Sequence, residues 1–229
     1  MSSEFVLIIF YIVIFVYSVI IHEVAHGLAA YYLGDLTAKY AGRLNLNPIK
    51  HIDLWGSIIV PFFMIMTTGF AFGWAKPVPY NPYNLKDQKW GPAIVALSGP
   101  GSNIILAVIC TILASLIGIT RSMKMDIIRH FNDWGTVSHV VSGSVGAIFF
   151  EIFVIVIFWN VLLAFFNLIP FPPLDGSKLL FAVFSIKTET MAIMEQYGFL
   201  FLLVFIWLFS GPLGYFLNAM INLFLKFAV

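Results

Sequence analysis

The strongest constraint in this sequence is a series of long apolar runs that contain almost no charged residues. A run of about 20 apolar residues is long enough to cross the hydrocarbon core of a bilayer as a helix. In lipid, only helices and closed barrels satisfy every backbone hydrogen bond within the protein. We therefore predict an all-α polytopic membrane protein with four to five transmembrane helices in a single domain, residues 1–229. The runs occupy roughly residues 5–33, 54–74, 91–119, 145–169 and 196–225.

The composition excludes several other classes of protein. Hydrophobic residues make up 61% of the chain and charged residues 10%, which is unlike a soluble domain. The formal net charge is +1, so the chain lacks the basic field that nucleic-acid binding needs. The single cysteine, Cys110, excludes an internal disulfide framework and a cysteine-rich zinc site.

Two segments after the first run affect the predicted topology. Pro61, Gly69 and Gly73 interrupt the run at 54–74, which favours a re-entrant segment over a fifth spanning helix. Polar and apolar residues alternate over 43–47, which favours a short β-hairpin after the first helix. The edge of that hairpin could then receive an extended substrate strand.

The motif His22-Glu23-Val-Ala-His26 lies inside the first apolar run. Histidines four residues apart on a helix share one face, so both imidazoles can reach a single ion. A zinc ion with three protein ligands lowers the pKa of a bound water to about 7, and Glu23 would then take up the proton. The alternative is a helix with two packed histidines and an interfacial glutamate, which buries three costly groups without a function. The motif therefore predicts one Zn²⁺ per chain, with Glu23 as the catalytic residue.

The third zinc ligand must come from a distant part of the chain. The best candidate is Asp175 in the stretch 167–176, because prolines break the helix there and Gly176 allows close backbone approach. The alternative role for Asp175 is to cap an ordinary interfacial turn. Zn²⁺ with ionised Asp175 and Glu23 and neutral histidines sums to zero charge, so the cluster can persist within a membrane.

Together, HEVAHG at 22–27 and NLIPFPPLDG at 167–176 resemble the two motifs of the site-2 protease family of intramembrane zinc metalloproteases. The segments GRLNLNP and GWAKPVPYNP resemble the compact subgroup without a peptide-binding (PDZ) domain. The resemblance implies that His22, His26 and Asp175 bind zinc and that Glu23 is catalytic. It also implies hydrolysis of a peptide bond in or near the transmembrane segment of a single-span protein or peptide substrate.

The stretch at 98–103 resembles the middle-helix motif of the same family, which implies that Asn103 lies near the zinc and supports the oxyanion or the substrate. The alternative is that the small residues around Asn103 only let membrane helices pack closely. Asn160 and Asn167 are expected to be structural, and Glu151 is expected to lie far from the metal, near the opposite interface. We expect exposed positions for three further histidines, none of them a ligand: His51, His130 and His139.

His22 and Asp175 each lie toward the C-terminal end of a helix, so they can meet only if those helices are parallel. This favours re-entry at 54–74. The Lys and Arg distribution then predicts termini outside the cytoplasm and a zinc site nearer the cytoplasmic face of the cell membrane.

Two alternatives to the protease interpretation remain open at this point. The first is a non-proteolytic zinc-binding membrane protein, either a pseudoprotease or a transporter. A transporter needs polar residues across the whole membrane, of which Glu151, Asn160 and Asn103 offer only pieces. The second is a membrane peptidase that trims prenylated proteins, but nothing beyond His-Glu-x-x-His matches that family.

Overall fold

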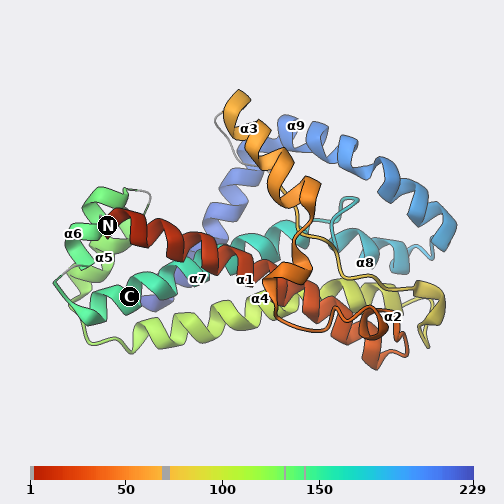
Figure 1. Cartoon of the computed structure of the whole chain (residues 1–229), viewed down its shortest axis with the longest axis horizontal. Coiled ribbons are helices and arrows are strands. Elements are labelled where there is room, and N and C mark those ends of the chain that lie inside the picture. The colour runs from red at the N-terminus through yellow and green to blue at the C-terminus, as the bar shows by residue number, and fades with distance from the viewer. Residues whose placement is uncertain (1–2, 69–72, 132, 142) are drawn as a thin grey trace.

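All regular elements in the described part of the computed structural model, which covers residues 3–68, 73–131, 133–141 and 143–229, are helices (Figure 1). The prediction of an all-α polytopic membrane protein is therefore confirmed. The helices long and apolar enough to span a membrane are α1 (Ser3–Tyr32), α4 (Gly91–Ser115), α7 (Val145–Asn167) and α9 (Thr188–Ala228). The shorter α-helices are α2 (Thr37–Tyr40), α3 (Val60–Thr68), α5 (Arg121–Arg129), α6 (Trp134–Val141) and α8 (Gly176–Val183).

The centre of the molecule is formed by α1, α4 and α7, and the C-terminal part of α9 packs against α4 and α7. On α7, Phe150, Val154, Ile157 and Val161 are fully buried. Their spacing of three and four residues places them in one stripe along the helix. Small residues such as Ala107 on α4 face the same core and allow the helices to approach closely.

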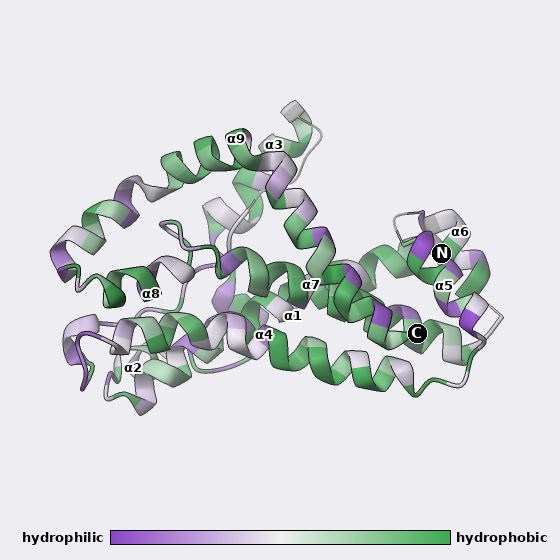
Figure 2. Cartoon of the chain, turned by 180° about the vertical axis from the view of Figure 1, so that it is seen from behind, coloured by the Kyte–Doolittle hydropathy of each residue, from purple (hydrophilic) through white to green (hydrophobic). Residues whose placement is uncertain are grey.

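The directions of the helices agree with the topology required for His22 and Asp175 to meet. In Figure 1, α1 and α7 run in the same direction, and α4 runs in the opposite one. Both chain termini lie at the same end of the molecule in Figures 1 and 2. This arrangement needs an even number of crossings, which the four long helices provide.

The apolar segment at 54–74 returns to the place where it begins. It consists of η2 (Leu54–Ile59), a π-helical stretch, followed by α3, which together are about 22 Å long and thus shorter than the hydrocarbon core. The backbone N–H of Trp74 donates to the carbonyl oxygen of Gly56 at 3.0 Å. The segment therefore leaves and returns at one place, which agrees with re-entry, and re-entry into the membrane stays a prediction. Gly69, one of the residues expected to interrupt it, lies outside the described residues.

The predicted β-hairpin after the first helix is wrong. No strand occurs in the described residues, and the segment forms the short helix α2, turns and the 3-10 helix η1 (Pro48–His51). The Asn45 amide donates to the carbonyl of Gly42, and Asn47 accepts from the backbone N–H of Ile49. These local side-chain bonds occupy backbone groups that a strand ladder would need.

The first part of α9 leaves the helix bundle. Phe209 has non-helical angles (φ −111°, ψ 18°), and Pro212 follows within the same helix. Proline removes a backbone donor and crowds the preceding turn, which accounts for a kink here. Figures 1 and 2 show the first part of α9 together with α3, apart from the bundle formed by α1, α4 and α7. Figure 2 also shows that the long helices are mainly hydrophobic, while hydrophilic residues gather near the two ends of the molecule.

Candidate metal centre

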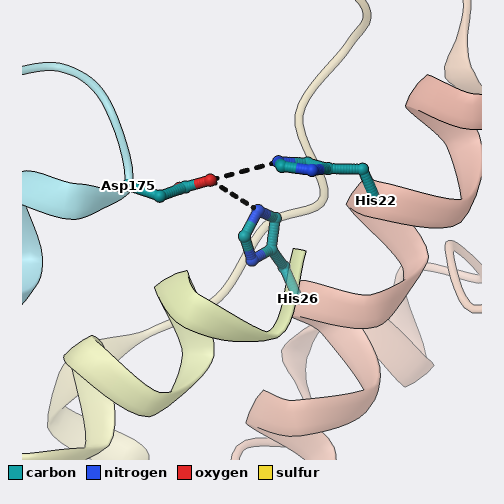
Figure 3. Close-up of side chains that lie close together, drawn as sticks. All are labelled: His22, His26 and Asp175. Carbon is teal, nitrogen blue, oxygen red and sulfur yellow. Dashed lines mark hydrogen bonds and ion pairs between the residues drawn. The ribbon is translucent and has the colours of Figure 1, made fainter. Parts of the chain in front are cut away.

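Three predicted ligands from distant parts of the chain lie together in the structure (Figure 3). His22 and His26 project from one face of α1, and Asp175 reaches them from the turn before α8. The Oδ2 atom of Asp175 lies 3.1 Å from Nε2 of His22 and 3.3 Å from Nε2 of His26. The ligand atoms of all three residues lie within 4.8 Å of one another. The side chains are 8%, 13% and 20% exposed, in the order His22, His26, Asp175.

The spacing of these atoms fits a single zinc ion. Ligand atoms that sit about 2.0–2.1 Å from zinc in a tetrahedral site are about 3.3–3.4 Å apart. The two measured separations, 3.1 and 3.3 Å, are close to this value. Two imidazole nitrogens and one carboxylate oxygen are also a donor set that zinc enzymes use, with the fourth position left for water or substrate.

Hydrogen bonds at the far side of each imidazole fix its tautomer. Nδ1 of His26 lies 2.7 Å from the carbonyl oxygen of Val95, and Nδ1 of His22 lies 2.6 Å from Oδ1 of Asn103. Because these oxygens accept hydrogen bonds, each Nδ1 carries the hydrogen. Both Nε2 atoms then keep a lone pair for the metal, which is the usual arrangement of zinc-binding histidines.

One face of α4 supports both histidines. Val95, Gly99 and Asn103 are four residues apart and therefore lie one above another on this helix. A Cβ atom at Gly99 would lie 2.7 Å from Nε2 of His22 and closer still to the ring of His26. Glycine is thus required at position 99 because the imidazoles occupy the space of a side chain. From the sequence, close helix packing by the small residues at 98–103 was only the alternative to a site role for Asn103. The spacing of four between Gly99 and Asn103 places both on one face.

Asn103 belongs to a buried network that holds His22. Its Nδ2 donates to Oδ1 of Asn160 at 2.6 Å and to the carbonyl oxygen of Ser18 at 3.2 Å. Asn160 in turn donates to Oγ of Ser18 at 2.9 Å. The amide hydrogens of Asn103 therefore serve protein acceptors in this structure. Its role toward an oxyanion or substrate stays a prediction.

Asp175 is held by a tightly folded turn after α7. A Cβ atom at Gly176 would lie 2.6 Å from the carbonyl carbon of Leu168 and 2.7 Å from the oxygen of Ile169, so backbone meets backbone here. This is the close approach expected from the sequence.

Glu23 lies on α1 between the two histidines and is partly buried. Its Oε2 accepts a hydrogen bond of 2.8 Å from the backbone N–H of Val78. Its Oε1 has no hydrogen-bond partner within the described part of the chain. The contact with Val78 could not be predicted from the sequence, because a backbone N–H is common to every residue type except proline.

The remaining polar residues singled out from the sequence lie outside this centre. Glu151 is fully buried beside the apolar core, and neither carboxylate oxygen has a hydrogen-bond partner among the described residues. His130 and His139 are exposed as expected. His51 is only 2% exposed, contrary to expectation. Its Nε2 lies 2.9 Å from the carbonyl oxygen of Asn45, and its own carbonyl accepts from the N–H of Lys76.

Known proteins are similar in sequence to this chain over most of its length. The sequence model of Peptidase family M50 matches residues 10–208. A protein named "Putative zinc metalloprotease YwhC" from Bacillus subtilis (strain 168) is 37% identical over 213 residues, which cover 92% of this chain and 85% of that protein. A protein named "Putative zinc metalloprotease Rip2" from Mycolicibacterium smegmatis is 30% identical over 188 residues, which cover 82% of this chain and 62% of that protein. No solved structure matches significantly. The chain therefore belongs to Peptidase family M50, the site-2 protease family.

Proposed function

We propose that this protein is an intramembrane zinc endopeptidase that hydrolyses a peptide bond in or near the transmembrane segment of a membrane-protein substrate. The observation that carries the proposal is the convergence of Asp175 with His22 and His26, two residues that flank Glu23 on a helix of membrane-spanning length. Membership of Peptidase family M50 supports the same function. We further propose that residues 1–229 work as one membrane-embedded unit.

The metal would be held by Nε2 of His22, Nε2 of His26 and Oδ2 of Asp175. Zinc bound in this way polarises a water molecule and a carbonyl oxygen, which supplies the nucleophile and the Lewis acid for hydrolysis. Ionised Asp175 supplies negative charge that offsets the ion in a medium where an unbalanced charge is costly.

Glu23 would serve as the general base and then as the general acid. Its Oε2 is occupied by the N–H of Val78, so Oε1 is the atom available to accept a proton from the attacking water. The same oxygen would then donate the proton to the leaving amine. Asn103 would support the site, and its contacts in this structure favour support through His22.

The substrate would be a single-span membrane protein or peptide presented by the lipid bilayer. A helical segment hides its peptide bonds, so the residues around the cleaved bond must unwind before they reach Glu23 and the ligands. Crossing by all four long helices would place both termini on one side. We propose that this side is outside the cytoplasm and that the zinc site lies nearer the cytoplasmic face, because most cationic residues lie at that end. These are Lys39, Arg43, Lys50, Lys76, Lys86, Lys89, Lys178 and Lys187.

The decisive experiment combines metal analysis with proteolysis. The intact protein in lipid nanodiscs is incubated with labelled single-span proteins, and bound zinc is measured in the same samples. We expect Glu23→Gln to keep zinc but to lose cleavage, whereas His26→Ala and Asp175→Ala lose both. Cleavage by Glu23→Gln at the wild-type rate would refute the assignment of Glu23. Stoichiometric zinc without cleavage of any substrate by the wild-type protein would instead indicate a non-proteolytic zinc-binding protein.

A further inference from the structure

The segment at 76–81, which we call the strap, crosses α1 next to the metal centre. Val78 in this strap donates its backbone N–H to Oε2 of Glu23 at 2.8 Å. Three features of the strap fix the position of this N–H: the neighbours of Val78 in sequence, the hydrogen bonds at both ends of the strap, and the packing of Val78 on α1.

The sequence of the strap leaves one donor at this position. Val78 stands between Pro77 and Pro79, and proline has no backbone N–H. Val78 is therefore the only residue of these three that can donate from the backbone. A residue that precedes proline is also restricted to extended conformations, which limits the directions in which this N–H can point.

Both ends of the strap are tied to the protein. At its start, Lys76 donates from its N–H to the carbonyl of His51 at 2.9 Å and accepts from Nη2 of Arg43 at 2.7 Å. At its end, the N–H of Asn81 donates to Oδ2 of Asp35 at 2.7 Å. Arg43, His51 and Asp35 are all buried. The strap is therefore held on each side of Val78 by hydrogen bonds to buried residues.

The side chain of Val78 locks the strap onto the helix face that carries Glu23. Val78 is 6% exposed, and a Cβ atom at Gly27 would lie 2.7 Å from its Cγ1. Gly27 follows Glu23 by four residues and thus lies directly beneath it on the same face of α1. Because Gly27 has no side chain, the strap can lie close enough to α1 for the N–H of Val78 to reach Glu23.

We propose that the backbone N–H of Val78 is a positioning group for catalysis: it binds Oε2 of Glu23 and so orients Oε1 toward the reacting water. This inference rests on the proposed role of Glu23 as the base. A hydrogen bond to an ionised carboxylate is stronger than one between neutral groups, and here both partners are already fixed before substrate binds. The carboxylate is therefore oriented before the reaction begins.

The test replaces one atom group and leaves the side chain in place. Valine 78 is exchanged for its α-hydroxy acid analogue by nonsense suppression, so that an ester oxygen replaces the N–H. A mispositioned catalytic group costs about 100-fold in rate, so we expect kcat to fall about 10- to 100-fold with KM and bound zinc unchanged. Val78→Ala keeps the N–H but loses the side-chain packing over Gly27, so it should lower kcat less than the ester does. The matched control is the same ester exchange at Tyr80, whose N–H makes no hydrogen bond within the described residues, and its kcat should stay within about twofold of the wild-type value.

Three results would overturn the inference. An unchanged kcat in the Val78 ester would show that Glu23 needs no help from the strap, and a higher kcat would show that the strap restrains it. An equal loss in Val78→Ala and in the ester would assign the effect to side-chain packing. The Glu23→Gln variant distinguishes failure of this inference from failure of the proposed function. If Glu23→Gln is inactive, Glu23 is needed and only the role of Val78 is refuted. If Glu23→Gln is active, Glu23 is not the catalytic base.

Discussion

Gly99 offers the sharpest test of the metal centre, because a single methyl group at this position would occupy the space of the two imidazoles. In Gly99→Ala, the new Cβ would lie 2.7 Å from Nε2 of His22. Ordinary contacts of a Cβ atom begin near 3.4 Å. The imidazole would therefore have to move by about 0.7 Å, and the ring of His26 would have to move further.

A displacement of this size is large on the scale of metal coordination. Zinc–ligand distances in real sites stay within about 0.2 Å of their usual values, so a shift of about 0.7 Å removes at least one ligand from bonding range. Loss of supporting contacts alone weakens metal binding about 10- to 100-fold. For displaced ligands we expect a loss of at least 100-fold in zinc affinity. The fold itself should lose only about 1–3 kcal/mol, which is typical of overpacking.

The assay measures zinc content by mass spectrometry, zinc affinity by competition with a chelator, and substrate cleavage, all on the protein in nanodiscs. Gly101→Ala is the matched control, because it adds the same methyl group to the same helix at a position where, apart from the adjacent backbone of α4, no described atom lies within 4 Å of the new Cβ. This control should bind zinc and cleave substrate like the wild-type protein. Stoichiometric, tightly bound zinc in Gly99→Ala would refute the close approach of α4 to the imidazoles.

Three further outcomes are expected. Asn103→Ala should weaken zinc binding about 10- to 100-fold in chelator competition, because His22 loses the acceptor for its Nδ1–H. Zinc removal by a chelator should abolish cleavage and lower the melting temperature, and added zinc should restore both, since a ligand that binds only the folded state stabilises it. Burial acts to raise the pKa of Asp35, but hydrogen bonds from Thr37, Asn84 and Asn81 outweigh it and hold the pKa below its usual value. The stability that Asp35 contributes is thus complete above about pH 4 and is lost as pH falls through the lowered pKa. The difference in melting temperature between the wild-type protein and Asp35→Asn should therefore shrink below about pH 4, and an equal difference at pH 3 and pH 7 would contradict this.

The cluster of candidate metal ligands could be predicted from the sequence because helical spacing fixes which residues share a face and because polar groups are costly in hydrocarbon. His22 and His26 share one face because they are four residues apart. Polar groups inside an apolar run are costly in a membrane, so they indicate a functional site. Asp175 was identifiable because prolines break the helix before it. The parallel arrangement of α1 and α7 followed from the requirement that these residues meet.

Features that depend on local backbone bonding could not be predicted in this way. Alternation at 43–47 suggested strands, but the side chains of Asn45 and Asn47 bind nearby backbone groups and form turns instead. His51 lies in a polar connection and was expected to be exposed, yet it is buried and bonded to backbone groups. The contact from Val78 to Glu23 uses a backbone N–H, which every residue except proline carries, so no pattern of residue types announces it.

The distribution of hydrogen bonds around the centre indicates the side from which a substrate would arrive under the proposed function. Behind His22, Asn103 and Asn160 are fully buried and bonded to other protein groups. On the opposite side, Asp175 is 20% exposed and Glu23 is partly exposed. Under the proposed function, water and an unwound peptide would therefore reach the candidate ligands from the side bounded by the strap and the turn that carries Asp175. The two histidines lie on the long helix α1, whereas the groups that would meet the substrate are held by extended or turn backbone next to it.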